Sequence, residues 1–261
     1  MDTSPLAARG AFPRGLAQPE TGFRFGSDAL LLASFAAGLP GTRVLDCGTG
    51  CGPAGLGLLL ARNDAATTVL GLDKEPAMVA AARENAARLG LADRFIVREC
   101  DLCAIRQDVS IAAESFDLVL ANPPYRHPAS GRRPTDAGRD AARFETGGGL
   151  AAFAAAAAYA VKNQGLLACI FLAERLAHVV TTLAANRLEI KRLQPVAARA
   201  EAPANQLLIL ARKNGRPGLC LEAPLVLYEG HGEATRLTQA ALSFCPFLAC
   251  NAGPQAGSES A

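Results

Sequence analysis

Short apolar runs alternate with longer segments of helical periodicity along most of this chain. Each run has the length of a β-strand, and the segments between the runs repeat apolar residues every three to four positions, as amphipathic helices do. The expected strands span residues 42–46, 67–73, 94–100, 116–121, 166–172, 188–193 and 206–211. The expected helices span residues 29–37, 75–89, 150–162 and 174–186, and one more begins near Pro53. This alternation predicts an α/β fold with a seven-stranded, mostly parallel sheet and helices on both faces.

The chain has 261 residues, half of them apolar, which is enough for one large domain with its own core. We expect this domain to span residues 23–250, between a flexible segment at 1–22 and a flexible tail at 251–261. Ser27 or Asp28 is expected to cap the helix that follows, and the last two strands are expected to form a hairpin-like edge.

Composition excludes several classes of protein. The longest apolar run, residues 150–161, is shorter than the about 20 residues that span a bilayer, and the first residues lack the pattern of a signal peptide. We therefore expect a cytoplasmic protein without a membrane partner, and we expect a monomer, although no feature of the sequence determines the oligomeric state. The eight cysteines are scattered, which favours free thiols, and Cys100-x-x-Cys103 has no second pair of ligands, so no metal site is expected.

Polar side chains follow four successive strands at the point where each one ends. These residues are Asp46, Asp73, Asp101 and Asn122. Open α/β sheets bind ligands at the carboxyl ends of their strands, so the four side chains are candidate ligand contacts. Gly48, Gly50 and Gly52 form a turn between the first strand and its helix, where a backbone can approach a ligand closely. Asp73 follows this turn by about twenty residues, the spacing at which a carboxylate accepts hydrogen bonds from ribose hydroxyls.

The fourth strand runs into Asn122-Pro123-Pro124-Tyr125. The two prolines make this loop stiff, because each fixes φ near −65° and lacks an N–H. The Asn122 side-chain oxygen and the Pro123 carbonyl can accept hydrogen bonds from a planar amino group, and the ring of Tyr125 can stack on a flat partner. Taken alone, the same residues also fit an ordinary turn after a strand.

The formal net charge of +2 does not by itself indicate a nucleic-acid partner. Positive charge is nevertheless concentrated just after the Asn-Pro-Pro-Tyr motif, in a loop rich in proline and glycine. The arginines of this loop are Arg126, Arg132, Arg133, Arg139 and Arg143. They can bind RNA phosphates beside the motif or belong to a solvated surface loop, and the sequence leaves both interpretations open.

Together these motifs resemble the class I methyltransferases that use S-adenosylmethionine, whose Rossmann-like fold has the sheet expected here. Within that class they resemble the amino-methyltransferases with (Asp/Asn/Ser)-Pro-Pro-(Tyr/Phe/Trp). Asp46 and the glycines at 48, 50 and 52 match the family motif Asp-x-Gly-x-Gly-x-Gly. Residues 23–35 resemble the lead-in of the bacterial tRNA1(Val) adenine-N6 methyltransferases, and the resemblance covers residues from about 20 to 245. Residues 225–230 resemble a strand of the family that is followed by a helix, but they match less well, because the Tyr-Thr that usually follows in the family is missing here.

The resemblance implies S-adenosylmethionine as cofactor and tRNA as partner. It implies that Asp73 binds the ribose hydroxyls of the cofactor and that Asp101 binds its adenine amino group. The turn at Gly48, Gly50 and Gly52 would contact the methionine portion, with Asp46 near its amino group. The implied reaction is methylation of the exocyclic N6 amine of an adenosine next to the anticodon.

For the target base, the resemblance implies that Asn122 and the Pro123 carbonyl hold the amine beside the cofactor while Tyr125 stacks on the ring. A protein glutamine N5-methyltransferase of the release-factor type remains an alternative, since it uses the same motif on an amide. An rRNA guanine-N2 methyltransferase, an RNA-binding or folding factor with a vestigial site, and an NAD-dependent dehydrogenase also remain open. The dehydrogenase leaves the Asn-Pro-Pro-Tyr motif unexplained.

Overall fold

The computed structural model describes residues 4–20, 24–124 and 149–251. Five parallel strands form one side of its main sheet, in the order β3 (Phe95–Glu99), β2 (Thr68–Asp73), β1 (Arg43–Cys47), β4 (Phe116–Ala121) and β5 (Val161–Leu172). The first four strands lie within one residue of their expected positions. The fifth begins five residues earlier than expected, and a bulge interrupts its pairing with β4.

The other side of the sheet contains both antiparallel and parallel pairs. β7 (Ala204–Lys213) pairs with β5, and β6 (Leu188–Ala197) pairs with β7, so the hairpin expected from the sequence is present. The later strand lies inside, between β5 and β6. Two short strands also pair with β6: β8 (Cys220–Leu221), which the sequence did not predict, and β9 (Leu225–Val226), which lies in the strand expected from the family resemblance. The hairpin is therefore not the outer limit of the sheet. The α/β fold with a mostly parallel sheet is confirmed.

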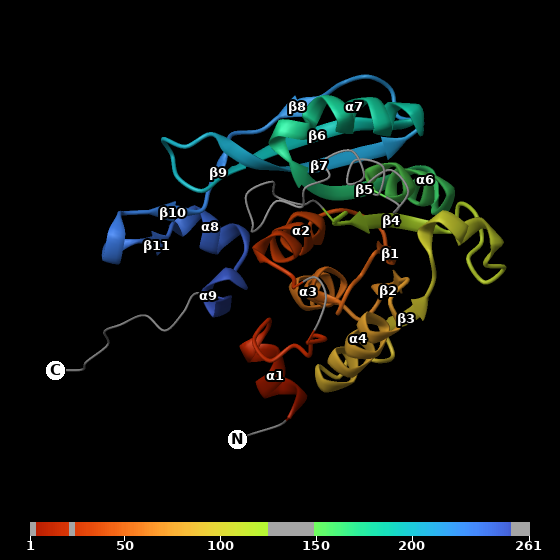
Figure 1. Cartoon of the computed structure of the whole chain (residues 1–261), viewed down its shortest axis with the longest axis horizontal. Coiled ribbons are helices and arrows are strands. Elements are labelled where there is room, and N and C mark those ends of the chain that lie inside the picture. The colour runs from red at the N-terminus through yellow and green to blue at the C-terminus, as the bar shows by residue number, and fades with distance from the viewer. Residues whose placement is uncertain (1–3, 21–23, 125–148, 252–261) are drawn as a thin grey trace, which may run out of the picture.

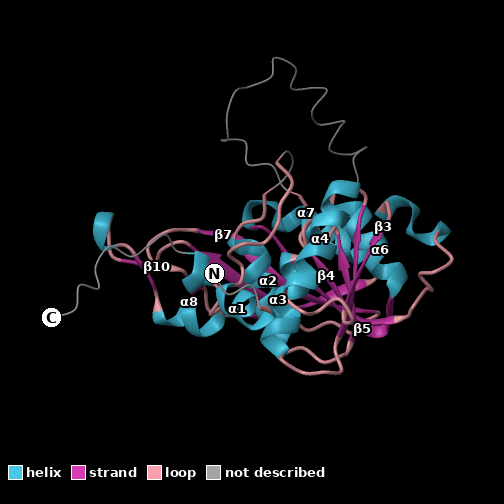
Figure 2. Ribbon diagram, turned by 90° about the horizontal axis from the view of Figure 1, so that it is seen from below, coloured by secondary structure: helices cyan, strands magenta, loops and turns pink. Residues whose placement is uncertain are grey.

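Helices cover both faces of the sheet (Figures 1 and 2). α2 (Ser27–Ala37), α3 (Pro53–Arg62) and α4 (Pro76–Arg88) contribute to one apolar core, and α6 (Leu150–Ala160) and α7 (Leu176–Ala185) contribute to the other. The strands supply alternate residues to the two cores, because successive side chains of a strand point to opposite faces. Val44 and Leu118 belong to the first core, for example, and Leu45 and Val119 to the second.

The expected cap of α2 was wrong. This helix begins at Ser27, its N-cap residue is Gly26, and no side chain caps it. Asp28 lies in the first turn instead, where its carboxylate accepts a hydrogen bond from the Ala29 N–H at 2.9 Å. A negative charge in the first turn still favours the helix through its dipole.

Both ends of the described chain carry further short elements. α1 (Pro5–Ala11) precedes α2, and the C-terminal part contains β10 (Tyr228–Glu229), β11 (Arg236–Leu237), α8 (Gln239–Phe244) and α9 (Leu248–Asn251). Three 3-10 helices complete the described part of the chain: η1 (Leu102–Gln107), η2 (Ala173–Arg175) and η3 (Gly232–Ala234). The C-terminal elements lie together beside α2 (Figure 1). The division into residues 1–22, 23–250 and 251–261 stays a prediction.

The parallel order decides where ligand-binding side chains can meet. β1 pairs with β2 on one side and with β4 on the other, so the carboxyl ends of these three strands lie next to one another. No described helix is long and apolar enough to cross a membrane. The cytoplasmic location stays a prediction.

Candidate active site

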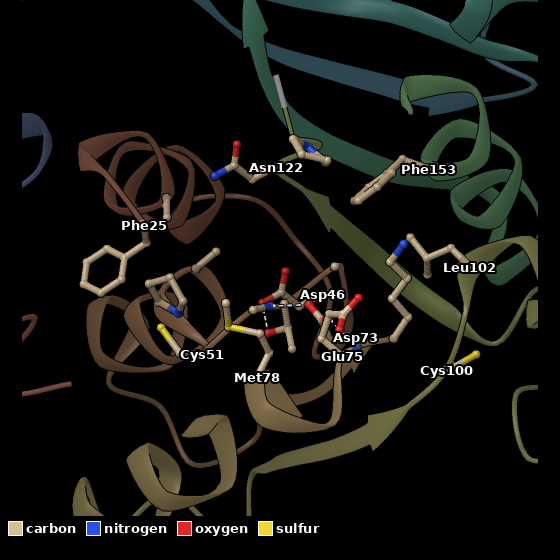
Figure 3. A pocket seen from close by; sticks show the side chains of 18 of the residues that line it. Phe25, Asp46, Cys51, Asp73, Glu75, Met78, Cys100, Leu102, Asn122 and Phe153 are labelled. Atoms are coloured by element: carbon tan, nitrogen blue, oxygen red, sulfur yellow. Dashed lines mark hydrogen bonds between the residues drawn. The ribbon is translucent and has the colours of Figure 1, made fainter. Parts of the chain in front are cut away.

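A cavity of about 560 Å³ opens at the carboxyl edge of the parallel strands. The glycine-rich turn after β1, the loops after β2 and β3, and the start of the loop after β4 all line it. Asp46, Asp73, Asp101 and Asn122, which the sequence placed at four strand ends, therefore line one cavity. Figure 3 shows Asp46, Asp73 and Asn122 around it. The parallel pairing of β3, β2, β1 and β4 brings them together.

Asp46 lies at the base of this cavity and is 2% exposed. Its Oδ2 accepts hydrogen bonds from the Thr49 hydroxyl at 2.6 Å and from the Gly55 N–H at 3.0 Å. Burial raises the pKa of this carboxyl to about 7, because water no longer solvates the charged form, while the two hydrogen bonds act in the opposite direction. Near neutral pH Asp46 can therefore gain or lose a proton inside the site.

The turn after β1 requires glycine. Gly48, Gly50 and Gly52 have φ values of 64°, 58° and 92°, which L-residues with a side chain rarely adopt. A Cβ at position 48 would lie 2.6 Å from Cζ of Phe153, whereas a Cβ at position 50 would meet no atom within 4 Å. Gly50 therefore presents its bare backbone to the open space of the cavity.

Asp73 connects this turn to the end of β2. Its Oδ2 accepts a hydrogen bond from the Gly50 N–H at 2.8 Å, and its Oδ1 accepts one from the Glu75 N–H at 3.0 Å. Each carboxylate oxygen has a second lone pair, so Asp73 can still accept hydrogen bonds from a ligand hydroxyl. The Asp73 carboxylate thus both braces the turn and lines the cavity.

The two remaining strand ends complete the rim. Asp101 precedes η1, and its Oδ1 accepts a hydrogen bond from the Cys103 N–H at 2.9 Å. Asn122 and Pro124 line the cavity directly, whereas Pro123 is buried between them. Tyr125 lies outside the described residues. So do the loop arginines Arg126, Arg132, Arg133, Arg139 and Arg143.

Two aromatic residues that the sequence did not single out also line the cavity. Phe153 comes from α6 and touches the glycine-rich turn, and Phe25 comes from the segment before α2. They lie on opposite sides of the cavity, with Asp46 and Asp73 between them (Figure 3). The resemblance of residues 23–35 to the family lead-in could have identified Phe25 as a site residue. Phe153 lies in an alanine-rich helix, and no pattern in the sequence marked it as part of the site.

The cysteines near the cavity are neutral at physiological pH. Burial raises the pKa of Cys51 to about 11 and also raises that of Cys100, so neither thiol is a ready nucleophile or thiolate ligand. Within the described ranges, no three His, Cys, Asp or Glu side chains are grouped so that they could hold a metal ion.

Known proteins share this architecture. A family model described as a methyltransferase domain matches residues 39–180. A tRNA1(Val) (adenine(37)-N6)-methyltransferase from Citrobacter koseri is 30% identical over 231 residues, which cover 86% of this chain and 90% of that protein. The enzyme with the same name from Porphyromonas gingivalis is 32% identical over 177 residues, covering 66% of this chain and 68% of that protein. This chain belongs to the methyltransferase family that includes these tRNA1(Val) adenine-N6 enzymes.

Solved structures agree on the fold of this methyltransferase. A predicted O-methyltransferase from Agrobacterium tumefaciens has a TM-score of 0.66 and 22% identity, covering 84% of this chain and 96% of that chain. The order of the seven long strands, with a cavity at the carboxyl edge of the parallel ones, is thus that of a Rossmann-like class I methyltransferase.

S-adenosylmethionine is the cofactor of this methyltransferase, and the cavity suits it. The open space at Gly50 accommodates a ligand against bare backbone, and four carboxylates line the same cavity: Asp46, Asp73, Glu75 and Asp101. Carboxylates suit the ribose hydroxyls and the ammonium group of S-adenosylmethionine, which are hydrogen-bond donors. Phe25, Met78 and Phe153 supply apolar surface for the rest of the molecule.

Proposed function

We propose that this chain transfers a methyl group from S-adenosylmethionine to the exocyclic N6 amine of an adenosine in tRNA, next to the anticodon. One observation carries the proposal: the strand end with Asn122 opens onto the same cavity as Asp46, Asp73 and Asp101. An amine held by Asn122 would therefore lie beside the bound cofactor. The curated relatives, which cover most of this chain, support tRNA as the substrate.

The carboxylates would divide the cofactor between them. Asp73 would accept hydrogen bonds from the ribose hydroxyls and Asp101 from the adenine amino group. The turn at Gly48, Gly50 and Gly52 would contact the methionine portion. Asp46, whose charge depends on pH near 7, would stabilise the nearby ammonium group when it is ionised. The bound cofactor would supply a sulfonium methyl group as the electrophile.

Asn122 and the Pro123 carbonyl would make the target amine reactive. The lone pair of an aromatic amine is delocalised into its ring, so the amine is a weak nucleophile. Two acceptors that bind its hydrogens outside the ring plane would localise the lone pair on nitrogen. Positive charge would develop on that nitrogen during transfer, and acceptors already in place would stabilise it. The surplus proton would then leave the methylated amine for water.

Tyr125 would stack on the target base, and the arginines at 126, 132, 133, 139 and 143 would bind tRNA phosphates. Bases that undergo chemistry leave their stack, and an aromatic ring compensates for part of that cost. These two roles rest on the sequence, because the residues lie outside the described ranges.

Analysis of the modified nucleoside tests the reaction. Unmodified tRNA would be incubated with the protein and methyl-labelled S-adenosylmethionine, digested to nucleosides and analysed by mass spectrometry. We expect the label in N6-methyladenosine. Parallel incubations would offer rRNA or a release factor in place of tRNA. Label in N2-methylguanosine of the rRNA, or in a glutamine of the release factor, would refute the tRNA adenine assignment and support the corresponding alternative.

Asn122→Ala tests the role of the strand end. Loss of an acceptor that acts on developing charge should reduce the single-turnover methylation rate by about 10² or more. The dissociation constant for S-adenosylmethionine should change much less. Asn122→Asp keeps an acceptor oxygen at the same position and serves as the matched variant, so it should retain more of the rate than Asn122→Ala. A wild-type rate in Asn122→Ala would show that this residue does not activate the amine.

A further inference from the structure

The N-terminal segment, residues 4–20, is tied to the rest of the protein far along the chain. The ring of Phe12 is 1% exposed and packs edge-on against Phe247 of the C-terminal part, with ring centroids 5.0 Å apart. Beyond Phe12 the segment crosses α4 at Ala17, and it then reaches Pro19, which lines the cofactor cavity. Through Pro19 the segment therefore forms part of the cavity wall.

Asn85 of α4 is fully buried at the point where this segment crosses the helix. Its Oδ1 accepts a hydrogen bond from the Ala17 N–H at 2.7 Å, and its Nδ2 donates to the Ala17 carbonyl at 3.0 Å. The same Nδ2 donates to the Cys51 carbonyl at 2.9 Å. One amide thus binds both backbone groups of the segment and a carbonyl of the glycine-rich turn.

This arrangement uses the particular chemistry of asparagine. Nδ2 has two hydrogens and each finds a carbonyl, while Oδ1 faces an N–H, so an acceptor or donor alone could not replace the amide. Asn85 is absent from the described lining of the cavity, and Cys51 and Pro19 on either side of it belong to that lining. Its three hydrogen bonds therefore connect two walls of the cavity without contacting its interior.

A second side chain of α4 acts on the same segment. Arg88 donates to the Gly15 carbonyl, and a Cβ at Gly15 would lie 2.5 Å from Nη2 of Arg88, so the guanidinium lies directly against the backbone. From the segment, Arg9 donates to the Leu89 carbonyl at 2.7 Å and to the Gly90 carbonyl at 2.9 Å, just beyond the end of α4. The helix thus holds the segment at several points.

We propose that Asn85 is a positioning residue for the cofactor: it fixes the N-terminal segment and the glycine-rich turn relative to each other, so that the part of the cavity wall at Pro19 and Cys51 is in place before S-adenosylmethionine binds. Without Asn85 the cofactor must order this wall itself, and the ordering cost appears as lost affinity. The inference deepens the proposed function, because it rests on the cavity being the cofactor site.

Asn85→Leu is the variant that tests it. Leucine has a similar size and leaves three backbone groups without their buried partner. We expect the dissociation constant for S-adenosylmethionine, measured by calorimetry, to rise roughly tenfold. We also expect the backbone amides of residues 15–20 in the cofactor-free protein to exchange hydrogen for deuterium faster.

Arg83→Met is the matched control. Arg83 lies on the same helix and donates two hydrogen bonds to the Val97 carbonyl, at 3.1 and 2.8 Å, on β3 and away from the N-terminal segment. This variant should lower the melting temperature while cofactor affinity and exchange at residues 15–20 stay at wild-type values. An Asn85→Leu protein that is destabilised but binds the cofactor with wild-type affinity would overturn the proposal.

Arg88→Met is the second variant, to be used if Asn85→Leu does not fold. The Arg88 hydrogen bond to Gly15 is exposed to solvent, so its loss should disturb folding less than the loss of the Asn85 hydrogen bonds. This variant should accelerate exchange at residues 15–20 and weaken cofactor binding by roughly twofold to fivefold, and unchanged affinity would again refute the proposal. Asp73→Ala in the same assay distinguishes a failure of the cofactor-site assignment from a failure of the positioning role of Asn85. If Asp73→Ala binds the cofactor normally, the cavity assignment fails; if only Asp73→Ala loses affinity, Asn85 has no positioning role.

Discussion

Replacing Gly50 or Gly48 by alanine should separate cofactor binding from folding. Both residues have similar positive φ values, 58° and 64°, so an alanine introduces a similar backbone strain at either position. That strain is about 1–2 kcal/mol, and it is partly offset by about 0.4–1 kcal/mol because alanine restricts the unfolded chain. The backbone contribution to the loss of stability is therefore about 1 kcal/mol in both variants.

The surroundings of the new methyl group differ between the two positions. At position 48 the Cβ would lie 2.6 Å from Cζ and 2.8 Å from Cε1 of Phe153, well inside the about 3.5–4.0 Å at which carbon atoms attract each other. Moving the buried ring adds about 1–3 kcal/mol. At position 50 the Cβ would meet nothing within 4 Å and would occupy space at the cavity wall.

Gly50→Ala should therefore lower the melting temperature by only about 2–4 °C, and Gly48→Ala by several degrees more. Gly50→Ala should nevertheless raise the dissociation constant for S-adenosylmethionine about tenfold or more, because its methyl group competes with the ligand for space. Scanning calorimetry and titration calorimetry on the same preparations provide both quantities. Wild-type cofactor affinity in Gly50→Ala would refute the cofactor assignment of this space, and equal melting temperatures would show that Phe153 withdraws without cost.

Two further predictions concern charge. Burial raises the pKa of Asp46 to about 7, so between about pH 4 and pH 7 the folded protein retains a proton that the unfolded chain has released, and stability contributed by this group falls as the pH rises through that window. Asp46→Asn should make the urea unfolding midpoint less dependent on pH between about 4 and 7, and an unchanged pH dependence would contradict the burial argument. Replacing Arg132, Arg133 and Arg139 by alanine should weaken tRNA binding and leave cofactor affinity unchanged. The slope of log affinity against log salt should decrease by a little under about 1 for each phosphate that is no longer bound, and equal slopes would favour an ordinary solvated loop.

The sequence determined those features of this protein that depend on neighbouring residues. Short apolar runs between longer helical segments located the strands, because a buried strand is a continuous stretch of a few apolar residues. The same runs placed Asp46, Asp73, Asp101 and Asn122 at strand ends, and parallel strands bring such ends to one edge. The Asn-Pro-Pro-Tyr motif and the glycine-rich turn were visible because stiff and strained backbone requires particular residue types.

Only the tertiary structure decided the features that depend on distant segments. The insertion of β7 between β5 and β6 reflects pairing across the sheet, which no local pattern encodes. The raised pKa of Asp46 requires burial by elements from several parts of the chain. Phe153 reaches Gly48 from more than a hundred residues away, and Asn85 holds Ala17 across 68 positions. Such contacts arise from packing in three dimensions, where sequence separation no longer measures distance.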